Sequence, residues 1–96
     1  MSAVTDNLQR HRFELDLDGQ IVFADYRPEG SRVILPHVEA PPALLGTGAS
    51  ARLMEGMLAL LRERGERIMP LCSYAAGYLR RHPEHHDLVA DVRPAR

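Results

Sequence analysis

Apolar and polar residues alternate along the first part of the chain. Every second position from residue 12 to 17 is apolar, and these positions are Phe13, Leu15 and Leu17. Successive side chains on a strand point to opposite faces, so this alternation predicts a half-buried β-strand. Asp18 and Gly19 follow, a pair typical of tight hairpin turns. Residues 20–26 are therefore expected to return as a second, antiparallel strand.

Two further strands are predicted, and each contains a proline. A turn at residues 27–31 leads into a third strand at 31–39, and a fourth strand is expected at 67–72. Proline has no backbone N–H and removes one hydrogen bond from a ladder. We therefore expect an edge or a bulge at Pro36 and another irregularity at Pro70.

Helical periodicity appears between the third and fourth strands. Residues 49–64 place apolar side chains on one face, namely Leu53, Met54, Met57, Leu58, Leu60 and Leu61. Gly65 is a natural end for this helix. Ser73 is a candidate cap for a shorter helix over residues 74–82, which Pro83 follows.

The predicted order of elements is β-β-β-α-β-α, with Leu88 and Val89 forming a short final strand or packing as a loop. Three strands joined by hairpins and a fourth joined by a helical crossover give an α+β fold with a mixed antiparallel and parallel sheet flanked by helices. One domain is expected over residues 10–90. Residues 1–9 are predicted to form a flexible N-terminus, and residues 91–96 a flexible tail.

Composition excludes several classes of function. The 96 residues are 45% hydrophobic and 26% charged, with a net charge of −1, which is ordinary for a soluble domain. No basic stripe with interleaved aromatic residues indicates a nucleic-acid surface, and no apolar run approaches the roughly 18 residues of a membrane span. The single cysteine allows no internal disulfide and suits a reducing cytoplasm, which is the expected location.

A glycine turn stands between the third strand and the long helix. In Gly46-Thr47-Gly48 the glycines let backbone N–H groups approach an anion, with the positive end of the helix dipole behind them. The spacing fits neither a Walker loop nor a dinucleotide fingerprint. The turn is a candidate phosphate-binding site, and the alternative is a plain connection.

Histidines near the end of the chain raise the question of a metal site. The candidate ligands are His82, His85, His86 and Asp87. The two adjacent histidines diverge and no cysteine joins them, so no metal site is expected.

Four segments together resemble one protein family. They are 37–42 (HVEAPP), 45–50 (LGTGAS), 70–74 (PLCSY) and 78–84 (YLRRHPE). In this order and spacing they look like the miniature, stand-alone branch of the GNAT N-acetyltransferases, found in plants, animals and bacteria. The resemblance covers roughly residues 7 to 90, and its specific part is the cysteine strand followed by the Tyr-x-x-Arg-His-Pro helix end.

The resemblance implies acetyl-CoA binding. In the family, the pyrophosphate lies on a turn of pattern Arg/Gln-x-x-Gly-x-Gly/Ala, and the pantetheine arm lies between two parallel strands that part. The strands here would be those ending near Val38 and Cys72. The turn carries over onto Gly46, Thr47, Gly48, Ala49 and Ser50. Leu45 replaces the Arg or Gln and removes a side-chain donor, whereas Ser50 is small enough to admit a phosphate.

A basic cluster follows the cysteine helix. The resemblance places Arg80, Arg81 and His82 near the CoA, where they would contact the 3′-phosphate or the pyrophosphate. The alternative is a solvated positive helix end that interacts favourably with the helix dipole.

Two residues are candidates for the chemistry. His37 is the candidate general base, because its ordinary pKa of about 6.5 suits proton transfer near neutrality; the alternative is a hydrogen-bonded histidine at a strand end. Cys72 precedes a helix and has three interpretations: covalent acetyl acceptor, proton donor to the departing CoA thiolate, or small buried apolar residue. The tyrosine that larger family members use as an acid falls at Leu79, one residue from Tyr78.

The predicted function is transfer of an acetyl group from acetyl-CoA to a primary amine, on a small molecule or a protein lysine, by a monomer or weak homodimer. A non-catalytic acyl-CoA-binding or protein-interaction module with the same fold is the competing prediction. A structural partner without a CoA site is the third.

Overall fold

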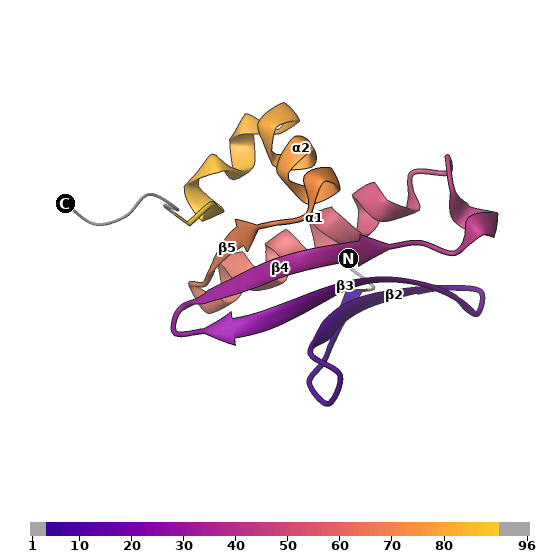
Figure 1. Ribbon diagram of the computed structural model, residues 1–96, viewed down its shortest axis with the longest axis horizontal. Coiled ribbons are helices and arrows are strands. Elements are labelled where there is room, and N and C mark those ends of the chain that lie inside the picture. The colour runs from indigo at the N-terminus through magenta and orange to yellow at the C-terminus, as the bar shows by residue number, and fades with distance from the viewer. Residues whose placement is uncertain (1–3, 91–96) are drawn as a thin grey trace.

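A computed structural model describes residues 4–90 of the chain. Its elements are β1 (Val4–Asn7), β2 (Arg12–Leu17), β3 (Gln20–Glu29), β4 (Arg32–Glu39), the 3-10 helix η1 (Pro42–Leu44), α1 (Ala49–Arg64), β5 (Arg67–Pro70), α2 (Ser73–Arg81) and the 3-10 helix η2 (Pro83–Leu88). The strands form one sheet in the order β1-β2-β3-β4-β5, with α1 packed along it and α2 beyond β5 (Figure 1). The predicted α+β fold is confirmed.

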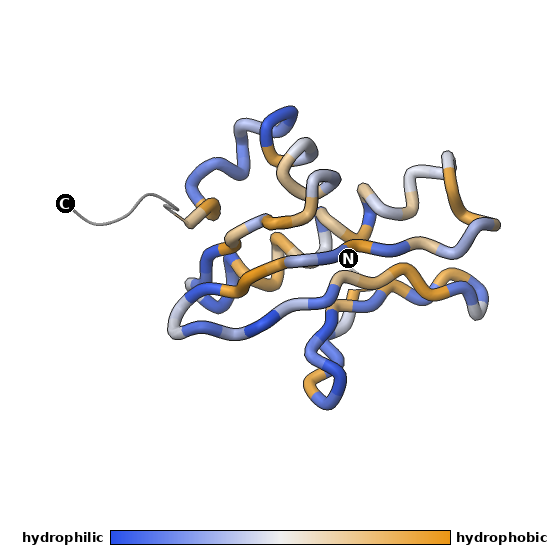
Figure 2. Tube along the Cα trace, in the orientation of Figure 1, coloured by the Kyte–Doolittle hydropathy of each residue, from blue (hydrophilic) through white to orange (hydrophobic). Residues whose placement is uncertain are grey.

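The sheet is mixed, as expected. Strands β1 to β4 are antiparallel to their neighbours, and β5 is parallel to β4 after the crossover through α1. Figure 2 shows the apolar segments concentrated in the strands and in α1, and the turns mostly hydrophilic. Among the described helices, none combines the length and the apolar character that a membrane span needs.

Strand β1 corrects the expectation of a flexible start. Its four residues pair with β2, from Val4 opposite Leu15 to Asn7 opposite Arg12. Val4 is the one apolar residue of β1, so the sequence has no alternation of apolar and polar residues that would predict this strand. The predicted order therefore lacked one strand. Residues 1–3 and the predicted tail, 91–96, lie outside the described residues.

A bulge interrupts β4 at the expected place. Asp25 lies opposite His37, whereas Arg27 lies opposite Ile34, so β4 holds one extra residue between these pairs. Pro36 belongs to that extra stretch, which fits its missing N–H. The predicted turn over residues 27–31 was too long, because β3 continues to Glu29.

Helix α1 begins and ends where its pattern predicts, and the residues after it differ in detail. Gly65 ends α1 in the left-handed region, with its N–H bonded to the carbonyl oxygens of Arg62 and Leu61. The N-cap of α2 is Cys72, without a side-chain capping bond, so the prediction that Ser73 caps this helix was wrong. Val89 forms an isolated parallel bridge with Ile68 rather than a further strand.

A partly buried ion pair on β2 makes stability depend on pH. Nε of Arg12 donates to Glu14 at 2.5 Å, and this hydrogen bond lowers the pKa of the Glu14 carboxyl below its ordinary value. A carboxyl whose pKa is lower in the folded protein stabilises it above the pKa of the unfolded chain, about 4.3, and this contribution is lost as the pH falls through the folded pKa.

We expect the Glu14→Gln variant to lose stability less steeply than the wild type between about pH 5 and pH 3, by at most about 1 kcal/mol. Urea unfolding across this pH range measures the difference, and Glu63→Gln on the exposed face of α1 is the control. Parallel profiles for Glu14→Gln and the wild type would contradict the assignment.

Candidate functional site

The start of α1 is an open helix N-terminus built by two glycines. Gly46 has φ 79° and Gly48 has φ 82°, the left-handed region where residues with a Cβ are strained. Gly48 is the N-cap and supplies no side-chain capping bond. The Thr47 hydroxyl donates to the carbonyl oxygen of Leu44 at 2.6 Å, so it braces the turn. The N–H groups of the first helical turn are therefore left to interact with a ligand.

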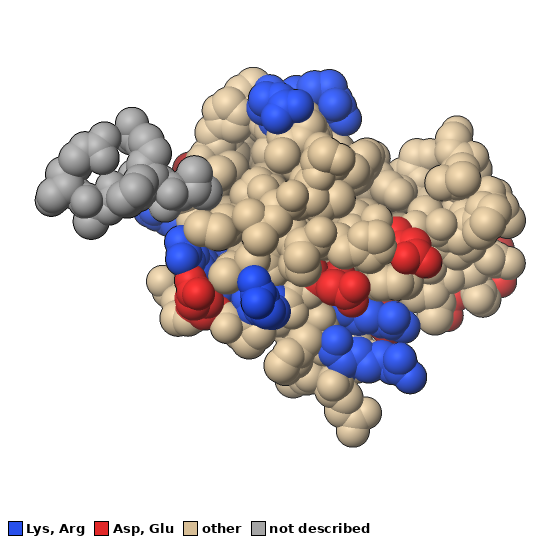
Figure 3. Space-filling model, viewed as in Figure 1, with Lys and Arg blue, Asp and Glu red and all other residues tan. Residues whose placement is uncertain are grey.

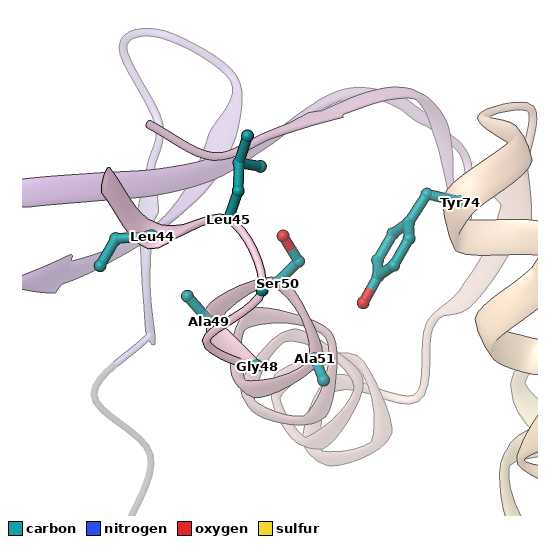
Figure 4. Close-up of a pocket in the computed structure, with 8 residues that line it drawn as sticks. Leu44, Leu45, Gly48, Ala49, Ser50, Ala51 and Tyr74 are labelled. Atoms are coloured by element: carbon teal, nitrogen blue, oxygen red, sulfur yellow. The ribbon is translucent and has the colours of Figure 1, made fainter. Parts of the chain in front are cut away.

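A cavity of about 300 Å³ opens beside this turn. Its lining comprises Leu44, Leu45, Gly46, Gly48, Ala49, Ser50, Ala51 and Tyr74. Figure 4 shows the Tyr74 ring reaching from α2 toward the first turn of α1, where the Ser50 side chain lies. Burial raises the pKa of the Tyr74 hydroxyl, so it remains a hydrogen-bond donor at neutral pH. The cavity is mainly apolar, with donors at one end.

Strands β4 and β5 part next to α2. Their last paired residues are Leu35 and Pro70. The carbonyl oxygen of Leu35 then accepts from the N–H groups of both Leu71 and Cys72, at 2.9 and 3.2 Å. Strand β4 continues to Glu39 without a pairing to β5, so its final residues are left free on this side. The two prolines thus lie where the parallel ladder ends, as the sequence indicated.

His37 lies in the part of β4 that has left β5. Its side chain is about half exposed, and its Nε2 lies 2.8 Å from Oε1 of Glu39. It pairs in register with Asp25, which alternates with the core residue Ala24. His37 therefore lies on the face of the sheet opposite α1, whereas Val38 packs against the core.

Cys72 lies at the other side of the parting strands. It is a free, partly buried thiol that packs against the core, and it is the N-cap of α2. His37 thus follows the point where the β4–β5 ladder ends on one strand, and Cys72 follows it on the other. The first N–H groups of a helix have no partner within the helix, so those at the start of α2 are available beside Cys72.

Comparison with known proteins identifies the family. The family described as GCN5-related N-acetyl-transferase matches residues 12–88. The chain belongs to the GCN5-related N-acetyltransferase family. The same fold occurs in the NMR solution structure of a GCN5-like protein from Staphylococcus aureus, with a TM-score of 0.72, 19% identity and coverage of 97% of this chain and 94% of that chain. A comparison with curated proteins gave no match.

In this GCN5-related protein, the predicted basic cluster is spread along the end of α2, and none of its members lines the cavity. Arg80 and Arg81 are exposed, and basic groups gather over α2 in Figure 3. Nη1 of Arg81 lies 3.3 Å from where a Cβ on Gly77 would sit, so this side chain folds back along the helix. The positive charge of Arg81 acts on Tyr74, which opposes the rise in the Tyr74 pKa. His82 instead stacks on Tyr78, with ring centroids 4.0 Å apart.

Tyr74 is the cavity residue that sequence reasoning missed. Tyr74 and Tyr78 are four residues apart in the sequence, a spacing that predicts a shared helical face and a core position. The two rings do lie together, with centroids 6.3 Å apart, and Tyr74 packs against the core. Tyr78 is 3% exposed, whereas Tyr74 is only partly buried and also lines the cavity. One feature of the sequence could have indicated the cavity position: Tyr74 falls in the first turn of the helix that follows the strand with Cys72.

Proposed function

We propose that this protein binds acetyl-CoA and transfers its acetyl group to a primary amine, on a small molecule or a protein lysine. One observation carries the proposal. The helix N-terminus at Gly48, preceded by two left-handed glycines, lines a cavity that Tyr74 of α2 also lines. Strands β4 and β5 part just before α2, so the proposed phosphate site and the proposed thioester site both adjoin this helix.

The pyrophosphate is proposed to lie on the first turn of α1. Its negative charge would interact with the N–H groups of Ala49 and Ser50 and with the positive end of the helix dipole. The Ser50 hydroxyl adds a donor, which partly replaces the one that Leu45 lacks. Arg81, whose positive charge acts on the cavity residue Tyr74, is proposed to contact a phosphate.

His37 is the proposed general base. Glu39 only accepts hydrogen bonds when ionised, so a hydrogen bond from His37 Nε2 to Glu39 places the hydrogen on Nε2 and the free lone pair on Nδ1. That lone pair takes the proton of the attacking amine. The amine nitrogen forms a bond to the acetyl carbonyl carbon, the carbon–sulfur bond breaks, and the CoA thiolate leaves.

Cys72 has two proposed routes. In direct transfer its thiol gives a proton to the departing CoA thiolate. In the covalent route its thiolate first attacks the acetyl group, which releases CoA, and the amine then attacks the acetyl-cysteine and frees the thiolate again. Backbone N–H groups at the start of α2 are available to stabilise the oxyanion in either route.

Intact mass after incubation with acetyl-CoA alone separates the two routes. A gain of one acetyl group in the wild type and in His37→Gln, lost in Cys72→Ala, indicates the covalent route. Binding without a mass gain indicates direct transfer. We expect His37→Gln to reduce kcat for amine acetylation by at least about 100-fold with little change in CoA affinity, and His11→Gln to be the silent control. Absence of CoA binding by the wild type would overturn the proposed function.

A non-catalytic acyl-CoA-binding or protein-interaction module is the second candidate. Two residues favour it: Leu45 lines the cavity where the family pattern has a donor, and Leu79 is buried at the place of the catalytic tyrosine of larger enzymes. CoA binding without turnover on a panel of amines would select this candidate.

The cytoplasm is the proposed location, because Cys72 is a free thiol and the chain has no second cysteine to pair with it. A monomer or weak homodimer is proposed, and size-exclusion chromatography with light scattering at several concentrations tests it.

A further inference from the structure

A cluster of polar side chains joins α1 to α2 and η2 outside the cavity. The Glu55 carboxylate of α1 accepts a hydrogen bond from the Tyr78 hydroxyl of α2. Both Glu55 oxygens also lie 3.1 Å from Nε2 of His85 in η2. One donor atom from each of Glu55, Glu84 and His85 lies within 4.8 Å of the others. Residues 30 positions apart in the sequence thus converge.

This cluster contains two carboxylates without an arginine partner. Several other acidic groups of residues 4–90 form ion pairs with arginine, as in Arg12–Glu14 and Arg62–Asp87. Within residues 4–90, the ion pairs of Glu55 and Glu84 are with His85 and His82. The fold therefore brings two negative groups together and supplies no permanent positive charge between them.

The His85 ring is mostly buried, and only one of its two nitrogens has a hydrogen-bond partner among the described residues. Its side chain is 13% exposed, which is far less than the 50% of the Glu55 side chain. Its Nδ1 is buried and has no hydrogen-bond partner among the described residues. The side-chain contact to a carboxylate is made by the other nitrogen, Nε2, which is therefore the atom placed to bind an ion beside Glu55.

We propose that Glu55, Glu84 and His85 form a binding site for a divalent transition-metal ion of the zinc type. One imidazole nitrogen and two carboxylate oxygens are donors that Zn²⁺ binds in proteins, and water can complete a tetrahedral shell. Bonds of about 2.0–2.2 Å place neighbouring tetrahedral ligands roughly 3.3–3.6 Å apart. The 3.1 Å separation of Glu55 and His85 is already close to that value.

Glu84, the third ligand, reaches the other two by a rotation of its side chain, which is exposed. Nδ1 of His82 lies 3.2 Å from Oε2 of Glu84 and is a neighbouring donor for the ion or its water. His86 is not part of the site, because its Nε2 lies 3.0 Å from the carbonyl oxygen of Leu79. The sequence-based rejection of a metal concerned His82, His85, His86 and Asp87 and did not include Glu55 or Glu84.

An ion at this site would link α1 to η2 and stabilise the folded protein. A ligand that binds only the folded state raises the free energy of unfolding with the logarithm of the ratio of its concentration to its dissociation constant. The proposal does not depend on acetyl-CoA binding, and the ion takes no part in acetyl transfer.

Calorimetric titration of untagged, EDTA-treated protein with ZnCl₂ tests the site, and Co²⁺ absorption reports its geometry. We expect one ion per chain, a rise in Tm on adding Zn²⁺, and affinity at least about tenfold weaker in Glu84→Gln and Glu55→Gln. Glu84 is exposed, so its replacement should leave the fold intact. The matched controls are Glu63→Gln on α1 and His11→Gln, which should bind as the wild type does.

Absence of Zn²⁺ binding would overturn the proposal. Equal affinity in the wild type and Glu84→Gln would also overturn it, because adventitious binding by surface histidines would then explain the heat. A similar loss in Glu63→Gln would show a nonspecific charge effect and count against the site as well.

Discussion

The Gly48→Val variant is expected to bind CoA roughly 100-fold more weakly than the wild type. Gly48 has φ 82°, and a β-branched residue held in the left-handed region costs about 1–3 kcal/mol. A Cβ at this position meets no protein atom within 4 Å, so it would extend into the space from which an anion approaches. The first turn of α1 would relax, and its N–H groups would no longer converge on one phosphate. Isothermal titration with CoA measures the loss.

Gly19→Val is the matched control for this experiment. Gly19 has φ 85°, and a Cβ there also meets no protein atom within 4 Å, but it belongs to the β2–β3 hairpin and does not line the cavity. Both variants should therefore lose similar stability, and only Gly48→Val should lose CoA affinity. Equal CoA affinity in the two variants would mean that the glycine turn does not take part in CoA binding.

The Phe13→Ala variant is expected to lose about 3–5 kcal/mol of unfolding free energy. The Phe13 side chain is fully buried, and its ring centroid lies 4.7 Å from that of Tyr26. Removing the ring leaves a cavity between the sheet and α1 and deletes the aromatic contact. The total free energy of unfolding of a small domain is about 5–15 kcal/mol, so a large share of the variant molecules should be unfolded at elevated temperature. Urea unfolding monitored by circular dichroism measures the change.

Ile21→Ala provides the comparison, because Ile21 is 36% exposed on the same hairpin. Its loss should be well under half of that at Phe13. A Phe13→Ala loss no greater than that of Ile21→Ala would mean that Phe13 does not lie in the core.

Local patterns predicted α1 and the two strands of the first hairpin well. The alternation at residues 12–17 and the helical apolar face ending at Gly65 each depend on residues that are near neighbours in the chain. Strand β1 depends instead on distant partners. Its Asp6 accepts hydrogen bonds from Tyr26, 20 residues away, and from Arg64, 58 residues away. Periodicity within a short stretch of sequence cannot predict contacts between residues so far apart in the chain.

The site divides in the same way. The glycine turn was predictable because a positive φ at Gly46 and Gly48 is a local property of the backbone. The place of Tyr74 at the cavity depends on how α2 packs relative to α1, so its spacing from Tyr78 predicted the shared face but not the cavity. The Glu55–His85 contact joins residues 30 positions apart, and only the fold brings them together.

The central claim is that CoA binds at the glycine turn and the parting of β4 and β5. Adding CoA to ¹⁵N-labelled protein and following its amide NMR signals tests this most directly. We predict saturable shifts concentrated at residues 46–51, at Tyr74 and at Cys72, with small shifts along β1 and β2. Unchanged spectra at millimolar CoA, or shifts that gather on the β1–β2 hairpin instead, would contradict the account.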